Sequence, residues 1–320
     1  MGKIGVLGNV VRNIVGVLGF APVESLVLVL VRGGVVDTVM RVDLRGATGA
    51  GGAARLAELV ARQDADGVVA VVVSEEGATC PTCGEQFRAV IDDVALALQR
   101  RGYPLLAAVM VDRIAAGGRW WCLDDKAVAG VLEDPASSAL AATAVANGRR
   151  MFASRAELAQ FVAVDAERVA AVAPLVGVGG PVKDVAVAVR AAVDAARRMA
   201  GGEVVSDAVL AEVGTSLADV RVRDALLHVG DADETAAAEA LWRVLARVLP
   251  APFRAEALAV LAFSCFLRGD GVLAGVALNA ALADNPGHGL AGLLDTALEN
   301  GMQPKELHGL IARIPPAVTV

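Results

Sequence analysis

The stretch GFAPVESLVLVLVRGGVVDTVMRVDL, from Gly19 to Leu44, decides the fold of the first half of the chain. A turn ending at Ser25 leads into the apolar run Leu26–Val31, a Gly-Gly pair reverses the chain, and a second β-rich run, Val35–Val42, returns. This pattern is typical of a β-hairpin. Because Leu26–Val31 shows no alternation of apolar and polar residues, we expect both faces of this strand to be buried inside a covered sheet.

The sequence around the hairpin alternates between helix and strand patterns. A short helix is predicted before it, over 11–18, and residues 74–84 are predicted to form a loop. Further helices and strands are predicted at 53–62 (helix), 68–73 (strand), 87–100 (helix) and 105–111 (strand). Gly117-Gly118 suits a second hairpin. This alternation predicts an α/β domain over residues 1–150, with a mixed sheet and packed helices.

The second half of the chain, residues 151–320, predicts an all-α helical domain. Its first helix has a capping-box pattern, Ser154-Arg155-Ala156-Glu157, and glycines and prolines separate the later helices. Residues 255–288 resemble one tetratricopeptide-like helical hairpin, with small residues where two helices approach and Pro286 after the second helix. A single repeat favours packing within a larger bundle over a peptide-binding groove.

Composition excludes several partner classes. The 320 residues are 56% hydrophobic and only 3% aromatic, so the core must be built from Ala, Val and Leu. A net charge of −7 argues against nucleic acid or an anionic membrane as a partner. No secretory signal or membrane span is evident, so we expect a cytoplasmic protein. Four cysteines in a reducing compartment do not imply disulfides.

The sharpest chemical motif is Cys80-Pro81-Thr82-Cys83. A CxxC pair that follows a strand and opens a helix can act as a redox dithiol, because the helix N-terminus lowers a thiol pKa. The same spacing supplies half of a zinc site, for which Cys122 is a candidate third ligand. In a third interpretation these are loop cysteines without a function. The sequence predicts no other cofactor.

Other candidate binding residues lie at strand ends. Glu24 and Ser25 could present an acid and a hydroxyl to a cleft, or they could cap the preceding turn. Asp43 and Asp112 follow predicted strands, where α/β sheets gather ligand groups and where strands also simply reach water. The adjacent Trp120 and Trp121 point to opposite faces of a strand, so at least one is a candidate partner contact.

Several segments spread over nearly the whole chain resemble domain-of-unknown-function family 4192, an actinobacterial family. The segments are Gly19–Val27, Arg41–Leu44, Gly118–Trp121, Ala153–Leu158, Arg254–Ala259, Gly269–Gly271 and Asn285-Pro286. The resemblance implies the two-part layout and no reaction, and the Ala, Val and Arg usage fits an actinobacterial or phage origin. Family members carry a cysteine-rich segment and a Pro-Gly turn after the double tryptophan. Here only Cys122 remains, so a metal site or bridge formed by that segment is expected to be lost unless Cys80 and Cys83 substitute.

Two classes of function follow from these residues. The first is a non-enzymatic protein that acts by contact, through a partner protein or as a homo-oligomer, because no Ser/His/Asp set is present and all three histidines lie in the helical half. The second is an enzyme or small-ligand binder with a site at the strand ends, with the CxxC redox or metal protein as a third possibility. The sequence favours the contact protein.

Overall fold

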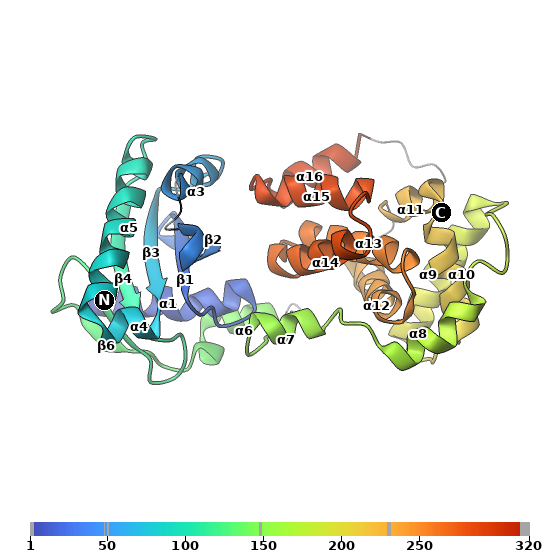
Figure 1. Ribbon diagram of the computed structural model, residues 1–320, viewed down its shortest axis with the longest axis horizontal. Helices are drawn as coiled ribbons and strands as arrows, with labels where there is room; N and C mark the ends of the chain where they lie inside the picture. Colours follow the sequence, from blue (N-terminus) through green and yellow to red (C-terminus); the bar gives the residue numbers. More distant parts are fainter. Residues whose placement is uncertain (1–2, 48, 50, 147–148, 229–231, 314–320) are drawn as a thin grey trace. The chain divides into compact units, whose positions relative to one another are not determined.

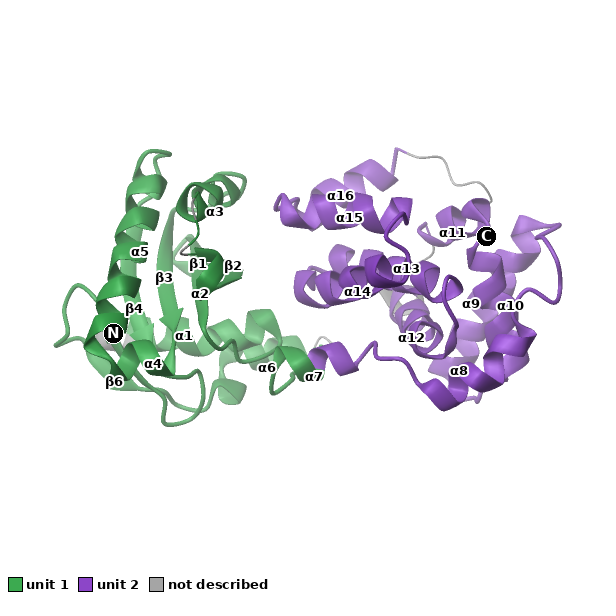
Figure 2. Cartoon of the chain, viewed as in Figure 1, with its two compact units in different colours: residues 1–157 green, residues 158–320 purple. Residues whose placement is uncertain are grey.

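The computed structural model describes residues 3–313, apart from 48, 50, 147, 148 and 229–231. The chain divides into two compact units, residues 1–157 and residues 158–320 (Figure 2). The first unit contains a mixed sheet with packed helices and the second is helical (Figure 1). The predicted fold class is confirmed. The two units divide after residue 157, whereas the sequence places the end of the first domain at residue 150.

A six-stranded sheet with the order β2-β1-β3-β4-β5-β6 forms the first unit. The strands are β1 (Ser25–Arg32), β2 (Val35–Asp43), β3 (Gly67–Val73), β4 (Leu105–Val111), β5 (Arg119–Cys122) and β6 (Ala129–Val131). Only the β3–β4 pair is parallel, and the other neighbours are antiparallel. The sheet is therefore mixed, with one crossover between two parallel strands at its centre.

The first hairpin forms as the sequence predicts. Gly33 and Gly34 connect β1 to β2 with φ angles of 58° and 79°, which a residue with a side chain rarely adopts. β1 lies between β2 and β3, and Leu26 to Leu30 are completely buried. The uninterrupted apolar run therefore reflects burial on both faces of the sheet.

Helices cover both faces of this sheet (Figure 1). On one face, α3 (Gly52–Val60) and α5 (Pro81–Gln99) pack on alternate residues of β1, β3 and β4. On the other, α1 (Lys3–Leu18) extends from β2 to β6 and packs against α6 (Ala139–Ala146). The remaining short helices of the unit are α2 (Leu44–Ala47), α4 (Glu75–Thr79) and the 3-10 turn η1 (Pro135–Ser137).

Trp120 is not an exposed contact surface, whereas Trp121 keeps part of its surface exposed and stays a predicted partner contact. Trp120 is only 2% exposed, and its indole lies 3.3 Å from the position that a Cβ would take at Gly8 of α1. Trp121 is partly buried and packs against the core beneath α3 and α5. The prediction of a partner contact at Trp120 is therefore wrong, because α1 begins at Lys3, well before the predicted 11, and covers this face.

Gly16 sets the distance between α1 and α6. A Cβ at this position would lie 2.5 Å from the backbone nitrogen of Ala141 and 2.6 Å from the carbonyl carbon of Leu140. We expect Gly16→Ala to destabilise the first unit by about 1–3 kcal/mol, although alanine is the better helix former. Thermal unfolding measures this change. Gly292→Ala is the control, since nothing lies within 4 Å of its added Cβ, and an increase in stability for both variants would contradict this packing.

The predicted loop at residues 74–84 is wrong, because this segment is mostly helical. Ser74 Oγ accepts a hydrogen bond from the Gly77 backbone nitrogen at 3.0 Å and so caps α4, whose first turn carries two glutamates. α4 ends at Thr79, Cys80 lies between the two helices, and Pro81 occupies the first turn of α5. The CxxC motif therefore opens a helix, as one interpretation of the sequence predicts.

The second unit consists of helices. Its elements are α7 (Arg155–Gln160), which spans the division, α8 (Ala166–Val172), the 3-10 turn η2 (Ala173–Leu175), α9 (Val185–Ala200), α10 (Asp207–Leu217), α11 (Val220–Leu226), α12 (Ala232–Val248), α13 (Phe253–Leu267), α14 (Gly271–Asp284), α15 (Gly289–Glu299) and α16 (Pro304–Ile311). At the start of α7, Ser154 Oγ accepts from the Glu157 nitrogen, whereas the Glu157 carboxylate accepts from Ala153. No described helix is long and apolar enough to cross a membrane.

α13 and α14 form the helical hairpin that the sequence predicts at 255–288. α13 also packs against α10, α12, α15 and α16, and every residue from Ala257 to Phe266 is buried. This burial leaves no open surface along α13 for a peptide, which favours packing within a bundle. The likeness to a tetratricopeptide repeat stays a prediction.

Candidate functional site

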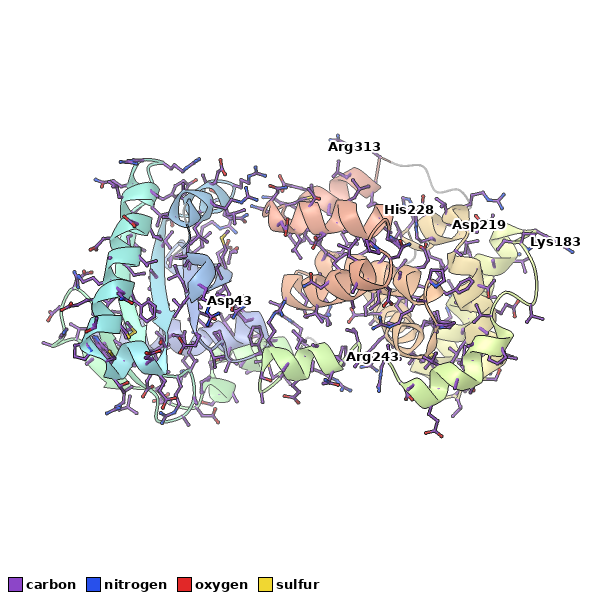
Figure 3. The ribbon with its side chains drawn as sticks, in the orientation of Figure 1. Asp43, Lys183, Asp219, His228, Arg243 and Arg313 are labelled. Carbon is purple, nitrogen blue, oxygen red and sulfur yellow. The ribbon has the colours of Figure 1, made fainter. Side chains whose placement is uncertain are left out.

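Three polar residues predicted at strand ends lie along one end of the sheet, together with Ser74. In the strand register, Ser25 is opposite Asp43 on one side and Val73 on the other, and Val73 is opposite Val111. Asp43, Ser25, Ser74 and Asp112 therefore follow one another across β2, β1, β3 and β4. Asp43 is exposed at the end of β2 (Figure 3). Three strand spacings of about 4.8 Å place Asp43 roughly 14 Å from Asp112, too far apart to hold one ion.

Ser25 is completely buried and its hydroxyl is used within the fold. Ser25 Oγ donates to the Val23 carbonyl at 2.6 Å and accepts from Arg41 Nε at 2.8 Å. The guanidinium of Arg41 also pairs with Asp43 at the strand end. This arrangement agrees with the turn-capping interpretation of Ser25 and leaves the hydroxyl no free proton for a ligand.

Asp112 closes the β4–β5 connection. Its Oδ1 accepts from the backbone nitrogens of Arg113 at 2.6 Å and Arg119 at 2.8 Å, and only 5% of the residue is exposed. The two arginine side chains lie 3.4 and 3.5 Å from Oδ2. The carboxylate therefore stabilises the hairpin that the sequence predicts at Gly117-Gly118.

Glu24 connects the start of β1 to α4. Its Oε2 accepts from Ser74 Oγ at 3.0 Å, and the same hydroxyl caps α4 through the Gly77 nitrogen. Ser74 is only 1% exposed, whereas the Glu24 side chain is open to solvent. Of the predicted strand-end residues, Glu24 is thus the one joined to the CxxC segment.

The two thiols of the CxxC motif face one helix N-terminus. Cys80 precedes α5 and Cys83 lies in its first turn, and both residues are partly exposed. Cys83 Sγ lies 3.5 Å from Oε1 of Glu76 in α4. The two thiols also interact directly with each other through a side-chain hydrogen bond. Because Cys80 precedes the first residue of α5 and has an extended backbone, a bond between the two sulfur atoms does not require α5 to unwind.

The pKa values of the two thiols move in opposite directions. The backbone N–H of Cys83 lowers the pKa of Cys80, helped by the Cys83 thiol and the Thr82 N–H, while burial and the charge of Glu76 oppose this. The interaction with Cys80 raises the pKa of Cys83 to about 11, and burial and Glu76 add to this effect. Cys80 is therefore the thiol that ionises first and Cys83 the thiol that keeps its proton.

The predicted metal ligands are not brought together. Cys122 lies two residues after Trp120, so its side chain faces the α1 side of the sheet, whereas Cys80 and Cys83 open α5 on the other side. Among the described residues, no group of three or more His, Cys, Asp or Glu side chains is placed to hold one ion. A zinc site made of Cys80, Cys83 and Cys122 would require a rearrangement of the fold.

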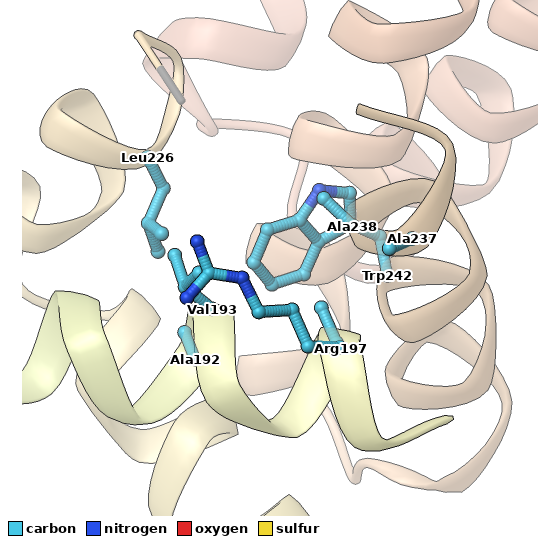
Figure 4. Close-up of a pocket in the computed structure, with 8 residues that line it drawn as sticks. Ala192, Val193, Arg197, Leu226, Ala237, Ala238 and Trp242 are labelled. Atoms are coloured by element: carbon cyan, nitrogen blue, oxygen red, sulfur yellow. The ribbon is translucent and has the colours of Figure 1, made fainter. Parts of the chain in front are cut away.

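A small hollow lies in the second unit, between α9 and α12 (Figure 4). Its cavity volume is about 10 Å³, close to the space that one water molecule requires. The walls are apolar except for the side chain of Arg197, which lies opposite Trp242. The hollow is therefore too small for a substrate, and it contains none of the predicted site residues.

Comparison with protein families tests the resemblance that the sequence motifs indicate. The family described as Domain of unknown function (DUF4192) matches residues 8–305. The chain belongs to this family. No curated protein and no solved structure matches it. The resemblance to DUF4192 is thereby confirmed, while an actinobacterial or phage origin stays a prediction.

Two residues beside the CxxC motif of this DUF4192 chain were not predicted as site residues. Ser74 and Glu76 lie within the segment predicted as a loop, yet both contact the site through α4. The pattern Ser74-Glu75-Glu76-Gly77 after an apolar strand could have indicated them, because serine followed by acidic residues is typical of a helix start. If this segment is interpreted as a helix, the carboxylate of Glu76 is expected beside the cysteines.

Proposed function

We propose that Cys80 and Cys83 form a dithiol that exchanges with disulfides of a protein or peptide substrate. The observation that carries the proposal is the pairing of the two thiols at one helix N-terminus with opposite pKa shifts. A nucleophilic thiolate and a resolving thiol are the two groups that such an exchange requires. This proposal departs from the contact function that the sequence favours.

The exchange has two steps. The Cys80 thiolate attacks one sulfur of the substrate disulfide, so that a Cys80–substrate S–S bond forms and the other substrate sulfur leaves as a thiolate. Cys83 then loses its proton and attacks the Cys80 sulfur, which releases the second substrate thiolate. The substrate disulfide gains two electrons and the protein dithiol loses two. Glu76, 3.5 Å from Cys83 Sγ, is placed to take the Cys83 proton and pass it to solvent.

A turbidity assay of insulin reduction by dithiothreitol tests this proposal. The protein is expected to reduce insulin faster than dithiothreitol alone, and the double variant Cys80→Ser/Cys83→Ser is expected to add nothing. The variant Cys122→Ser is a control, since Cys122 is buried in β5 and faces the other side of the sheet. A wild-type rate equal to that of dithiothreitol alone would refute the exchange function.

The contact hypothesis also predicts a homo-oligomer, which can be tested separately. Burial of Trp120 removes one of the surfaces that favoured that hypothesis. Native mass spectrometry of the reduced protein measures subunit number and bound mass together. A zinc adduct that is lost in the Cys80→Ser/Cys83→Ser variant would favour a metal site over the exchange function.

A further inference from the structure

Glu24 has an unusual backbone conformation. Its φ angle is 41°, and it is the one residue other than glycine with a positive φ in the part of the chain that the structure describes. A residue with a side chain is strained in this left-handed conformation, because its Cβ lies too close to the backbone. The Glu24 carbonyl accepts from the Leu44 nitrogen at 3.0 Å, so the first residue of α2 holds the strained residue in place. Strain of this kind persists where the surrounding structure enforces it, and it clusters at functional sites.

The Glu24 side chain acts on α4 through one buried hydroxyl. Ser74 Oγ donates its proton to Glu24 Oε2 at 3.0 Å and accepts from the Gly77 nitrogen at 3.0 Å. Because Ser74 is 1% exposed, water does not readily replace Glu24 as the acceptor. Glu24 therefore fixes the orientation of the hydroxyl that starts α4.

α4 in turn contacts both cysteines. The Glu76 carbonyl accepts from the Cys80 nitrogen at 2.8 Å, and the Glu76 carboxylate lies 3.5 Å from Cys83 Sγ. A change in the start of α4 would therefore move Glu76 relative to both thiols.

We propose that Glu24 is a positioning residue for the Cys80–Cys83 dithiol, acting through Ser74 and α4 to hold Glu76 against the two thiols. Its relevance to catalysis rests on the proposed exchange function, whereas its effect on the thiols does not. The carboxylate of Glu76 raises the pKa of both cysteines. Loss of the Glu24–Ser74 hydrogen bond should therefore lower both thiol pKa values, in the same direction as removal of the Glu76 charge.

Three substitutions at Glu24 separate the causes of such an effect. Glu24→Ala removes the hydrogen bond and keeps the strained φ, and Glu24→Gly removes the hydrogen bond while suiting the φ of 41°. Glu24→Gln removes the charge and keeps an oxygen that can accept from Ser74. We expect Glu24→Ala and Glu24→Gly to lower the thiol pKa values equally. Glu24→Gln should leave these pKa values close to those of the wild type.

The experiment measures the alkylation rate of each cysteine against pH, by peptide mapping of the reduced full-length protein. In Glu24→Ala we expect the Cys83 thiolate fraction at a given pH to rise about threefold, or about half a pKa unit. Adding Glu24→Ala to Glu76→Gln should cause no further shift, because the two changes act through one contact. If Glu24→Ala fails to fold, Ser74→Ala is the second variant. It removes the same hydrogen bond and should lower the thiol pKa values in the same way.

Three results would overturn the inference: unchanged thiol pKa values in both Glu24→Ala and Ser74→Ala, shifts that add to those of Glu76→Gln, or an equal shift in Glu24→Gln. The last result would show a direct effect of the Glu24 charge. No disulfide substrate is used, so failure of the exchange function leaves this test valid. Conversely, insulin reduction with unchanged pKa values in the variants would refute only the role of Glu24.

Discussion

Cys83→Ser is expected to trap a stable mixed disulfide between Cys80 and a substrate, whereas Cys80→Ser is expected to trap none. In Cys83→Ser the first attack still occurs, but no second thiol is present to resolve the Cys80–substrate bond. In Cys80→Ser the remaining thiol lacks the N-terminal position at which backbone N–H groups stabilise a thiolate. Incubation with a disulfide-bonded peptide, followed by intact-mass measurement, distinguishes the two outcomes.

The direction of this asymmetry follows from the two pKa values. The pKa of Cys83 is raised to about 11, whereas the backbone N–H of Cys83 lowers the pKa of Cys80 below the ordinary thiol value. At pH 7 the thiolate fraction of Cys80 therefore exceeds that of Cys83. The lower intrinsic nucleophilicity of the more acidic thiol offsets part of the difference in rate. Equal labelling of Cys80 and Cys83 by substoichiometric iodoacetamide would contradict the assignment.

Arg254→Ala is expected to destabilise the second unit by about 3–5 kcal/mol, which lowers its unfolding temperature by roughly 6–20 °C. Arg254 is only 7% exposed and its guanidinium connects three segments. Nε donates to the Ala246 carbonyl at 2.7 Å, Nη2 to the Val162 carbonyl at 2.8 Å, and Nη1 to Asp284 at 2.6 Å. Alanine leaves these acceptors without their donors, which costs more than the lost contacts alone.

Two variants in the same unit control this prediction. Arg254→Lys keeps a positive charge for Asp284 but cannot reach three acceptors in different directions, so we expect an intermediate loss. Arg221→Ala removes an arginine that pairs with Asp219 in solvent, with 61% of its side chain exposed, so little change is expected. Thermal unfolding followed by circular dichroism measures all three. If Arg254→Ala lowered the unfolding temperature as little as Arg221→Ala, the buried hydrogen bonds of Arg254 would contribute little to stability.

Two strands of the first unit could be predicted because a continuous apolar run indicates a strand that is buried on both faces. Leu26–Val31 and 68–73 are continuous apolar runs, and both become strands buried on two faces. β6 could not be predicted, since Ala129–Val131 is too short for a pattern and becomes a strand only by pairing with β5. The extent of α1 was also hidden, because Gly8 weakens a helix in isolation but gives room for Trp120.

The candidate site was predictable in its residue types and not in its connections. The predicted strand-end residues lie at one end of the sheet because of the register between neighbouring strands. That register depends on the order of the strands, which the sequence predicts only in part. The contact of Glu24 with Ser74 spans 50 positions and depends on β1 lying beside β3. Nothing in the spacing of the cysteines indicates that Glu76 lies beside Cys83, since that requires the five-residue helix α4.

A redox titration of the Cys80–Cys83 pair is the strongest test of the proposed exchange function. The protein is equilibrated in glutathione buffers of graded potential, alkylated, and its disulfide content read by mass. We expect a reversible disulfide with a potential between about −270 and −120 mV, the range of known exchange catalysts. A disulfide with a reduction potential below about −300 mV, as in structural disulfides, would contradict the exchange function. So would a pair that forms no disulfide at any potential.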